Sequence, residues 1–141
     1  MNRDIKFRAY RKDKGIMMYF DLDDIAYNGW SNYIFKDDGR TRKEIDLIRD
    51  ENVILMQYIG LKDKNDKEIY EGDIVDVYNL HNNYLGKQII AYDENAGCYE
   101  IKVLDHSDWV YTAIGWAMKA GYKIEVIGNR YENFWLMENI I

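Results

Sequence analysis

Apolar and polar side chains alternate over most of the second half of the chain. Between residues 99 and 104, Tyr99, Ile101 and Val103 fall on one face, and Glu100 and Lys102 fall on the other. A period of two is typical of a half-buried β-strand, because successive side chains of a strand point to opposite faces. The same pattern, interrupted by turn-forming residues, predicts further strands over residues 74–78, 87–92, 109–113 and 123–127.

The first half of the chain predicts a β-hairpin followed by a strand with two apolar faces. Residues 4–11 alternate, residues 13–15 supply a turn, and residues 16–20 form the return strand. Residues 53–59 are apolar on both faces. This pattern indicates either a central strand or a strand whose second face meets another subunit.

Short helices are expected near the end of the chain. Residues 113–120 have a helical composition and precede Gly121, a residue type favoured just after a helix. Asn133 is a suitable N-cap for a short amphipathic helix over residues 134–137. Thr41–Glu44 has the form of a capping box, but a strand-like run follows so soon that a helix there is doubtful.

Together these elements predict a mainly β fold with an N-terminal β-hairpin region and one or two short helices. The strand spacing favours a small, barrel-like second half, and residues 71–75 are similar to turns of SH3-like barrels. No linker or repeat divides the 141 residues. We therefore expect a single compact domain over residues 1–141, with residues 1–60 and 61–141 as its sub-units if it has two.

Charge and cysteine content narrow the classes of function. The chain carries 19 Lys and Arg against 25 Asp and Glu, a net charge of −6. This balance argues against a protein that binds phosphates mainly through bulk positive charge. Neither a signal peptide nor a membrane-length apolar run is found, and the lone Cys98 cannot form an internal disulfide. We expect a cytoplasmic protein of a bacterial host cell.

No set of residues predicts catalysis. Asp21, Asp23 and Asp24 form an acidic cluster that has the ligands for Mg²⁺, but such clusters are usually solvated loop charge. His106 lies in one loop beside acidic and hydroxyl side chains, and such neighbours do not converge as a hydrolytic triad. Cys98 has no basic neighbour that would activate its thiol. We expect no catalytic residue, no metal and no cofactor.

The aromatic content, 15% with 13 Tyr and 4 Trp, is high for a small β core. Aromatic side chains on a β surface stack nucleobases, and they also anchor protein interfaces. Lys6 and Arg8 share one face of the first predicted strand and could contact phosphate, although edge-strand charge is the commoner role. The candidate contact residues, for protein or nucleic acid, are Lys6, Arg8, Tyr70, Tyr78, Trp109 and Tyr111.

One long motif resembles a known family. Residues 55–75, LMQYIGLKDKNDKEIYEGDIV, resemble the signature of the YopX family of small bacteriophage and prophage proteins. Residues 5–10 and 125–133 are similar to the opening and closing strands of that family. Phe134 stands where the family often has proline, and residues 21–50 follow no family pattern. The resemblance implies a β-rich fold, phage origin and self-association, but no biochemical role.

The motif residues have structural interpretations that require no ligand. Gly60 and Gly72 stand at strand ends, where glycine gives backbone freedom. Asp63, Asn65 and Asp73 are turn formers. An EF-hand calcium site is rejected, because residue types at three required positions of this loop are wrong.

These observations favour one function and leave three alternatives. The preferred hypothesis is a non-enzymatic, oligomeric protein-interaction module, with itself and a host protein as partners and no membrane. The first alternative is a nucleic-acid-binding protein that uses the Lys6 and Arg8 face and the aromatic residues. The others are an acidic inhibitor of a host protein and a metal-dependent enzyme at Asp21, Asp23 and Asp24.

Overall fold

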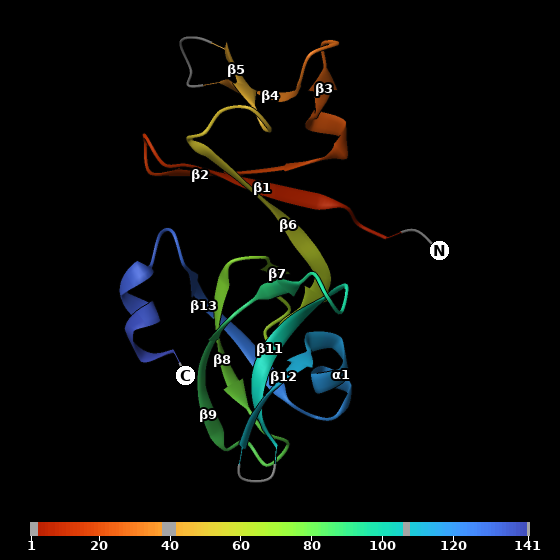
Figure 1. Ribbon diagram of the computed structural model, residues 1–141, viewed down its shortest axis with the longest axis vertical. Coiled ribbons are helices and arrows are strands. Elements are labelled where there is room, and N and C mark those ends of the chain that lie inside the picture. The colour runs from red at the N-terminus through yellow and green to blue at the C-terminus, as the bar shows by residue number, and fades with distance from the viewer. Residues whose placement is uncertain (1–2, 38–41, 106–107, 141) are drawn as a thin grey trace. The chain divides into compact units, whose positions relative to one another are not determined.

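The alternating segments form antiparallel strands in the computed structural model, which describes residues 3–37, 42–105 and 108–140 (Figure 1). Contacts divide the chain into two compact units, unit 1 (Met1–Tyr58) and unit 2 (Ile59–Ile141). The strands of unit 1 are β1 (Lys6–Arg11), β2 (Ile16–Asp21), β3 (Ala26–Tyr27), β4 (Asn32–Asp37) and β5 (Arg42–Asp46). The strand β6 (Val53–Lys62) runs from unit 1 into unit 2.

Unit 2 contains the remaining strands and the α-helix. The strands are β7 (Glu68–Tyr70), β8 (Asp73–Tyr78), β9 (Tyr84–Ile89), β10 (Ala91–Asp93), β11 (Cys98–Asp105), β12 (Asp108–Ala113) and β13 (Lys123–Asn129). The α-helix α1 (Ile114–Lys119) lies between β12 and β13, and two 3-10 helices, η1 (Leu22–Asp24) in unit 1 and η2 (Phe134–Asn139), complete the described elements. The prediction of a mainly β fold is confirmed.

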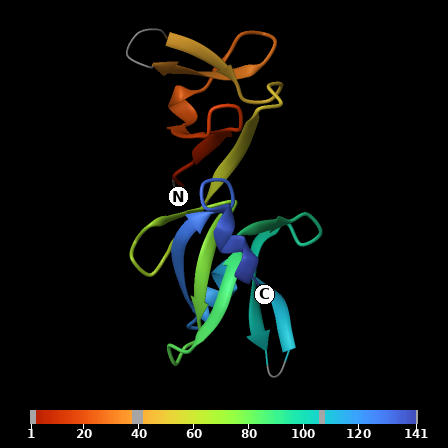
Figure 2. The same cartoon turned by 90° about the vertical axis from the view of Figure 1, so that its left-hand side faces the viewer.

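The strands form open sheets. The orders are β2-β1-β6-β7, β3-β4-β5, β13-β8-β9 and β10-β11-β12, and none of these sheets of described residues closes into a barrel. β6 is an interior strand between β1 and β7, which is the first of the two arrangements that its apolar faces indicated. In Figure 2 the β11–β12 hairpin, drawn in teal and cyan, extends from the rest of unit 2.

The N-terminal hairpin forms as predicted, with β1 and β2 antiparallel and Arg11 opposite Ile16. The Arg11 guanidinium donates two hydrogen bonds to the Asp13 carboxylate, from Nε to Oδ1 at 3.0 Å and from Nη2 to Oδ2 at 2.8 Å. This pairing lowers the pKa of the Asp13 carboxyl. Gly15 completes the turn with a φ of +64°, a conformation that glycine adopts without strain.

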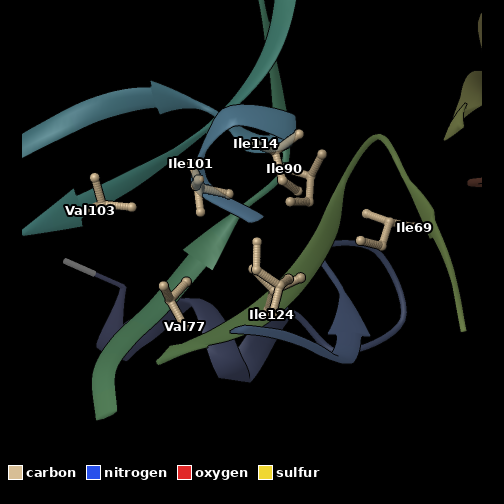
Figure 3. Packing of buried hydrophobic residues seen from close by; sticks show 9 residues of the cluster. Ile69, Val77, Ile90, Ile101, Val103, Ile114 and Ile124 are labelled. Carbon is tan, nitrogen blue, oxygen red and sulfur yellow. The ribbon is translucent and has the colours of Figure 1, made fainter. Parts of the chain in front are cut away.

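Two separate groups of apolar side chains form the interior. In unit 1, Ala9, Met18 and Phe20 of the hairpin pack with Ile34, Ile45 and Leu47. In unit 2 the labelled side chains of Figure 3 gather in one core from four strands, from α1 and from the residue between β9 and β10; they are Ile69, Val77, Ile90, Ile101, Val103, Ile114 and Ile124. Ile101 and Val103 are the inward residues of the alternation in β11, as the sequence predicts.

Strand boundaries between residues 79 and 93 differ from the prediction. The expected strand over residues 87–92 covers parts of two strands, β9 and β10, and β9 begins at Tyr84, three residues before the predicted start. Ile90 lies between them; its backbone N–H donates to the Asp73 carbonyl at 2.9 Å, and its carbonyl accepts the Gly72 N–H at 3.0 Å. The Ile90 side chain is buried in the core of unit 2.

The predicted helices are partly right. α1 forms within the expected range, and Gly121 follows it with a φ of +99°. η2 begins after Asn133, but the Asn133 side chain makes no cap hydrogen bond and instead accepts the Asn129 N–H at 3.1 Å. Thr41 lies outside the described residues, and the segment after it is the strand β5, paired with β4.

The two isoleucines of the β5 region give a matched test of the unit 1 core. Ile45 is buried, whereas Ile48, three residues later, is 63% exposed. We expect Ile45→Ala to lower the free energy of unfolding by about 2–5 kcal/mol, because it leaves a cavity. Ile48→Ala should change it by less than about 0.5 kcal/mol. Urea denaturation measures both, and equal losses would contradict the assignment of Ile45 to the core.

Candidate functional site

The buried carboxylate of Asp63 joins the motif loop to the last strand of unit 2. Its Oδ1 accepts the backbone N–H groups of Asn65 at 2.8 Å and Lys67 at 2.9 Å. Its Oδ2 accepts the N–H of Val126, on β13, at 2.8 Å. An ionised carboxylate in this position satisfies three backbone donors at once. Asp63 therefore has a structural role, and Asn65 is an exposed residue of the turn it organises.

Gly72 and Asp73 hold the next turn of the motif. Asp73 is buried, and its Oδ2 accepts the Tyr70 N–H at 2.7 Å. Gly72 is also buried, with a φ of +87°, and its carbonyl accepts the Arg130 N–H at 3.0 Å. Gly60 likewise has a positive φ, +88°. These glycines hold backbone conformations that side chains with a Cβ rarely adopt.

Asn129 organises the closing segment in the same manner. This buried side chain accepts the N–H groups of Tyr131 at 3.0 Å and Glu132 at 2.8 Å through Oδ1. Its Nδ2 donates to the Glu132 carboxylate at 2.9 Å. A Cβ at Gly128 would lie 2.6 Å from Asn133 Oδ1, so the turn has no room for a larger residue there. The side chains of Asp63, Asp73 and Asn129 are thus each bonded to backbone N–H groups.

The basic candidates Lys6 and Arg8 lie on β1, but they differ in accessibility. Arg8 is 3% exposed, so it presents almost no surface to a phosphate. Lys6 is half-buried, and its Nζ lies 6.0 Å from the centroid of the Tyr58 ring. Sequence alternation placed both on one face correctly, but it could not show that this face is buried at Arg8.

The aromatic candidates do not form one site. Tyr70 is buried, and Tyr78 is half-buried with Lys64 Nζ 4.8 Å above its ring centroid. Tyr111 is 65% exposed on β12, where Lys102 Nζ lies 5.7 Å from its ring centroid. Trp109 lies two residues earlier on the same strand, with a side chain outside the described part of the structure. Only Trp109 and Tyr111 are brought to one strand.

The acidic cluster caps the first 3-10 helix. Asp21 Oδ1 accepts the Asp23 N–H at 2.9 Å, and Asp24 Oδ2 accepts the Asp21 N–H at 3.0 Å. This is a reciprocal capping box, which accounts for the acidic residues at these positions. Within residues 3–37, 42–105 and 108–140, no three His, Cys, Asp or Glu side chains are grouped to hold a metal ion.

The other reactive residues stand apart from these. Cys98 is half-buried on β11, opposite Asp93 of β10. His106 lies outside the described residues. Among the described helices, none has the length and apolar character needed to cross a membrane.

The structure reveals an exposed tryptophan, stacked against an arginine, that the sequence did not indicate. Trp30 is 67% exposed, and the Arg49 guanidinium lies 4.0 Å above its ring centroid. Asn28 Oδ1 fixes the Trp30 loop by accepting the N–H groups of Trp30 at 2.9 Å and Ser31 at 3.0 Å. An Asn two residues before Trp30 is a sequence signal for such a turn, because Asn side chains commonly accept backbone N–H groups two residues later.

The loop that carries Arg49 is fixed by a second carboxylate. Asp46 Oδ1 accepts the N–H groups of Arg49 and Ile48, each at 2.9 Å. The Arg49 and Ile48 bonds are the main cause of the lowered pKa of the Asp46 carboxyl. Because each loop is held by its own hydrogen bonds, the stacked pair is presented in a fixed geometry.

Exposed aromatic side chains also occur in unit 2. Trp116 on α1 is 62% exposed, and Phe134 and Trp135 of η2 are 67% and 54% exposed. The Phe134 and Trp135 rings meet edge to face, with centroids 5.6 Å apart. Each of the three tryptophan side chains that the structure describes is therefore more than half exposed, an arrangement typical of binding surfaces.

The negative charge of the chain lies in one unit. Residues 1–58 contain 11 basic and 11 acidic residues, whereas residues 59–141 contain 8 basic and 14 acidic residues. The candidate aromatic residues Tyr70, Tyr78, Trp109 and Tyr111 all belong to this acidic unit 2. Its charge opposes the binding of a phosphate backbone and favours partners with basic surfaces.

Comparisons with known proteins place these features in a family. The family model described as "YopX protein" matches residues 6–138. The crystal structure of protein yopX from Bacillus subtilis is similar with a TM-score of 0.66 and 21% identity, covering 93% of this chain and 96% of that one. Protein EF1440 from Enterococcus faecalis gives a TM-score of 0.55 and 28% identity over 96% of this chain and 99% of its own. No curated protein matches.

Removal of the Asp63 carboxylate should destabilise unit 2. We expect Asp63→Ala to lower the free energy of unfolding by about 2–4 kcal/mol, because three backbone donors lose their acceptor in a buried turn. Asn65→Ala is the matched control in the same loop, and its loss should stay below about 0.5 kcal/mol. Urea denaturation followed by circular dichroism measures both, and equal losses would refute the role of Asp63.

Glu100 gives a pH-dependent test. Burial and the nearby Asp93 carboxylate raise the pKa of the Glu100 carboxyl above its unfolded value. Its contribution to stability is therefore fully present below the unfolded pKa and is lost as the pH rises through the folded pKa.

We expect Glu100→Gln to raise the melting temperature at pH 7, with the gain disappearing on acidification to about pH 4. Glu138→Gln removes the same charge from an exposed position of unit 2 and should show no comparable gain. Thermal denaturation across this pH range measures the difference. A gain for Glu100→Gln that is equal at both pH values would contradict the proposed cause.

Proposed function

The chain belongs to the YopX protein family, and from that premise we propose that it is a non-enzymatic protein-interaction module that associates with itself and with a host protein. The module is encoded by a bacteriophage or prophage and acts in the cytoplasm of the bacterial host. The observation that carries the proposal is the exposure of Trp30, Trp116 and Trp135, each more than half accessible. Large aromatic side chains in such positions supply the anchors of protein interfaces.

The hydrogen bonds of the motif support a role without catalysis. Asp63, Asp73 and Asn129 are buried polar residues of the family-like segments, and their side chains accept backbone N–H groups. Carboxylates committed to backbone donors maintain a turn rather than abstract protons from a substrate. The capping box gives the cluster at Asp21 and Asp24 the same structural explanation.

The charge of unit 2 supports a second candidate, an inhibitor that occupies the nucleic-acid site of a basic host protein. Such a site is built to attract negative charge, and unit 2 has a strong excess of acidic residues. In this role the aromatic side chains would anchor the contact and the acidic residues would speed association. Direct binding of nucleic acid is less well supported, because Arg8 is buried and the aromatic candidates lie in the acidic unit.

The molar mass in solution, with and without oligonucleotides, tests the proposal. We expect size exclusion with light scattering to show an oligomer whose mass is unchanged by a mixed pool of single- and double-stranded oligonucleotides at low salt, about 50 mM. A mass that grows with the pool and falls back at high salt would instead establish nucleic-acid binding.

Capture of host proteins tests the second part of the proposal. The full chain should retain a host protein from nuclease-treated lysate, and replacement of Trp30, Trp116 and Trp135 by Ala should abolish this retention. Leu80→Ala is the control, because Leu80 is 56% exposed and aliphatic. Retention that is lost on nuclease treatment, or that the triple variant preserves, would overturn the assignment of these side chains as anchors.

A further inference from the structure

The strand β12 forms an edge of its sheet. The order β10-β11-β12 gives β12 a hydrogen-bonded neighbour on one side only. In Figure 2 no other described strand runs along its outer side. Within the described residues, none of the backbone hydrogen bonds formed outside strand ladders and helices involves Val110, Tyr111 or Thr112. The outward N–H and C=O groups of Val110, Tyr111 and Thr112 therefore face no other strand of the described residues.

After its first residue, Asp108, this edge has none of the features that usually prevent pairing with another strand. Natural edges carry charged residues, proline or bulges. Residues 109–113 are Trp-Val-Tyr-Thr-Ala, without charge or proline, and their register with β11 is continuous. Val110 is 42% exposed and Tyr111 is 65% exposed. β-branched and aromatic residues of this kind are the residue types that pair best across strands.

We propose that β12 pairs antiparallel with β12 of a second copy of this chain, and so joins two three-stranded sheets into one. The inference deepens the self-association part of the proposed function and rests on it. The two copies are related by a two-fold axis perpendicular to the sheet, so the same face of both sheets points the same way. With the axis at Tyr111, the two Tyr111 residues are opposite each other, and Val110 of each copy is opposite Thr112 of the other. This arrangement buries both exposed side chains against residues of matching character.

Charge explains why a second copy can meet at this strand. Two copies of the acidic unit 2 repel each other, so contact is favoured where the surface carries no charge. The run 109–113 is such a surface. Lys102, which is opposite Tyr111 on β11, is one strand inward and lies over the Tyr111 ring, so it does not meet its counterpart at the junction.

The size of the contact sets its strength. A pair of six-residue edges buries less area than the roughly 1,200–2,000 Å² of a standard interface. We therefore expect dimerisation that depends on protein concentration rather than a permanent dimer.

Sedimentation equilibrium of the full chain tests the pairing. The wild type should associate as its concentration rises, and Tyr111→Lys should raise the dissociation constant at least about tenfold, because two like charges then face each other. Tyr27→Lys is the matched control: Tyr27 is 68% exposed in unit 1, and the change adds the same charge. It should leave the association of the wild type unaltered, and circular dichroism confirms that each variant is folded.

Cross-linking tests the same contact without disrupting it. In a Cys98→Ser background, Tyr111→Cys should form a disulfide-linked dimer when oxidised glutathione accepts the two electrons, since paired strands place opposite Cα atoms at disulfide distance. Tyr27→Cys in the same background should remain uncross-linked.

The outcomes separate this inference from the proposed function. Self-association that Tyr111→Lys leaves intact, without cross-linking at Tyr111→Cys, would overturn the role of β12 and leave self-association standing. A wild type that stays monomeric at every concentration would overturn both the pairing and self-association, while capture of host proteins would still test the interaction module.

Discussion

The hydrogen bonds of the Asp63 carboxylate are the constraint on which unit 2 depends. One side chain accepts N–H groups from its own loop and from Val126, on a strand 63 residues later in the chain. A buried carboxylate without these donors would be strongly destabilising, so the turn, the loop and β13 must be in place together. The backbone N–H of Lys64 adds a bond to the Ile124 carbonyl at 2.9 Å, beside the apolar core that Ile124 enters.

The same principle extends through the other family-like segments. Gly72 contacts Ile90 and Arg130 through its backbone, Asp73 holds the turn at Tyr70, and Asn129 organises the turn before η2. Chemically reactive residue types in these segments are thereby committed to folding. This explains why a motif that is specific enough to identify a family says little about an activity. Its residues hold the turns between strands, a role that requires no substrate.

The residues that can contact a partner therefore lie at the surface, where hydrogen-bonded turns and strands present aromatic side chains. Trp30 is held by the turn at Asn28 and covered on one side by Arg49, which Asp46 positions. Tyr111 stands on a strand edge that carries no charge over residues 109–113. These surfaces differ in geometry, which is why we propose self-association for one of them and a different partner for another.

The sequence by itself determined the strands whose pattern is local, and the residues that must adopt special backbone conformations. Alternation predicted β11 with Ile101 and Val103 inside, and Gly72 was identified because few residue types suit a turn at a strand end. Only the tertiary structure decided which aromatic and charged residues are accessible. Tyr70 and Arg8 are buried, whereas Trp30 is exposed, because exposure depends on which segments pack across each face. That packing joins residues distant in the chain, as Asp63 and Val126 show, and periodicity along a single strand carries no information about it.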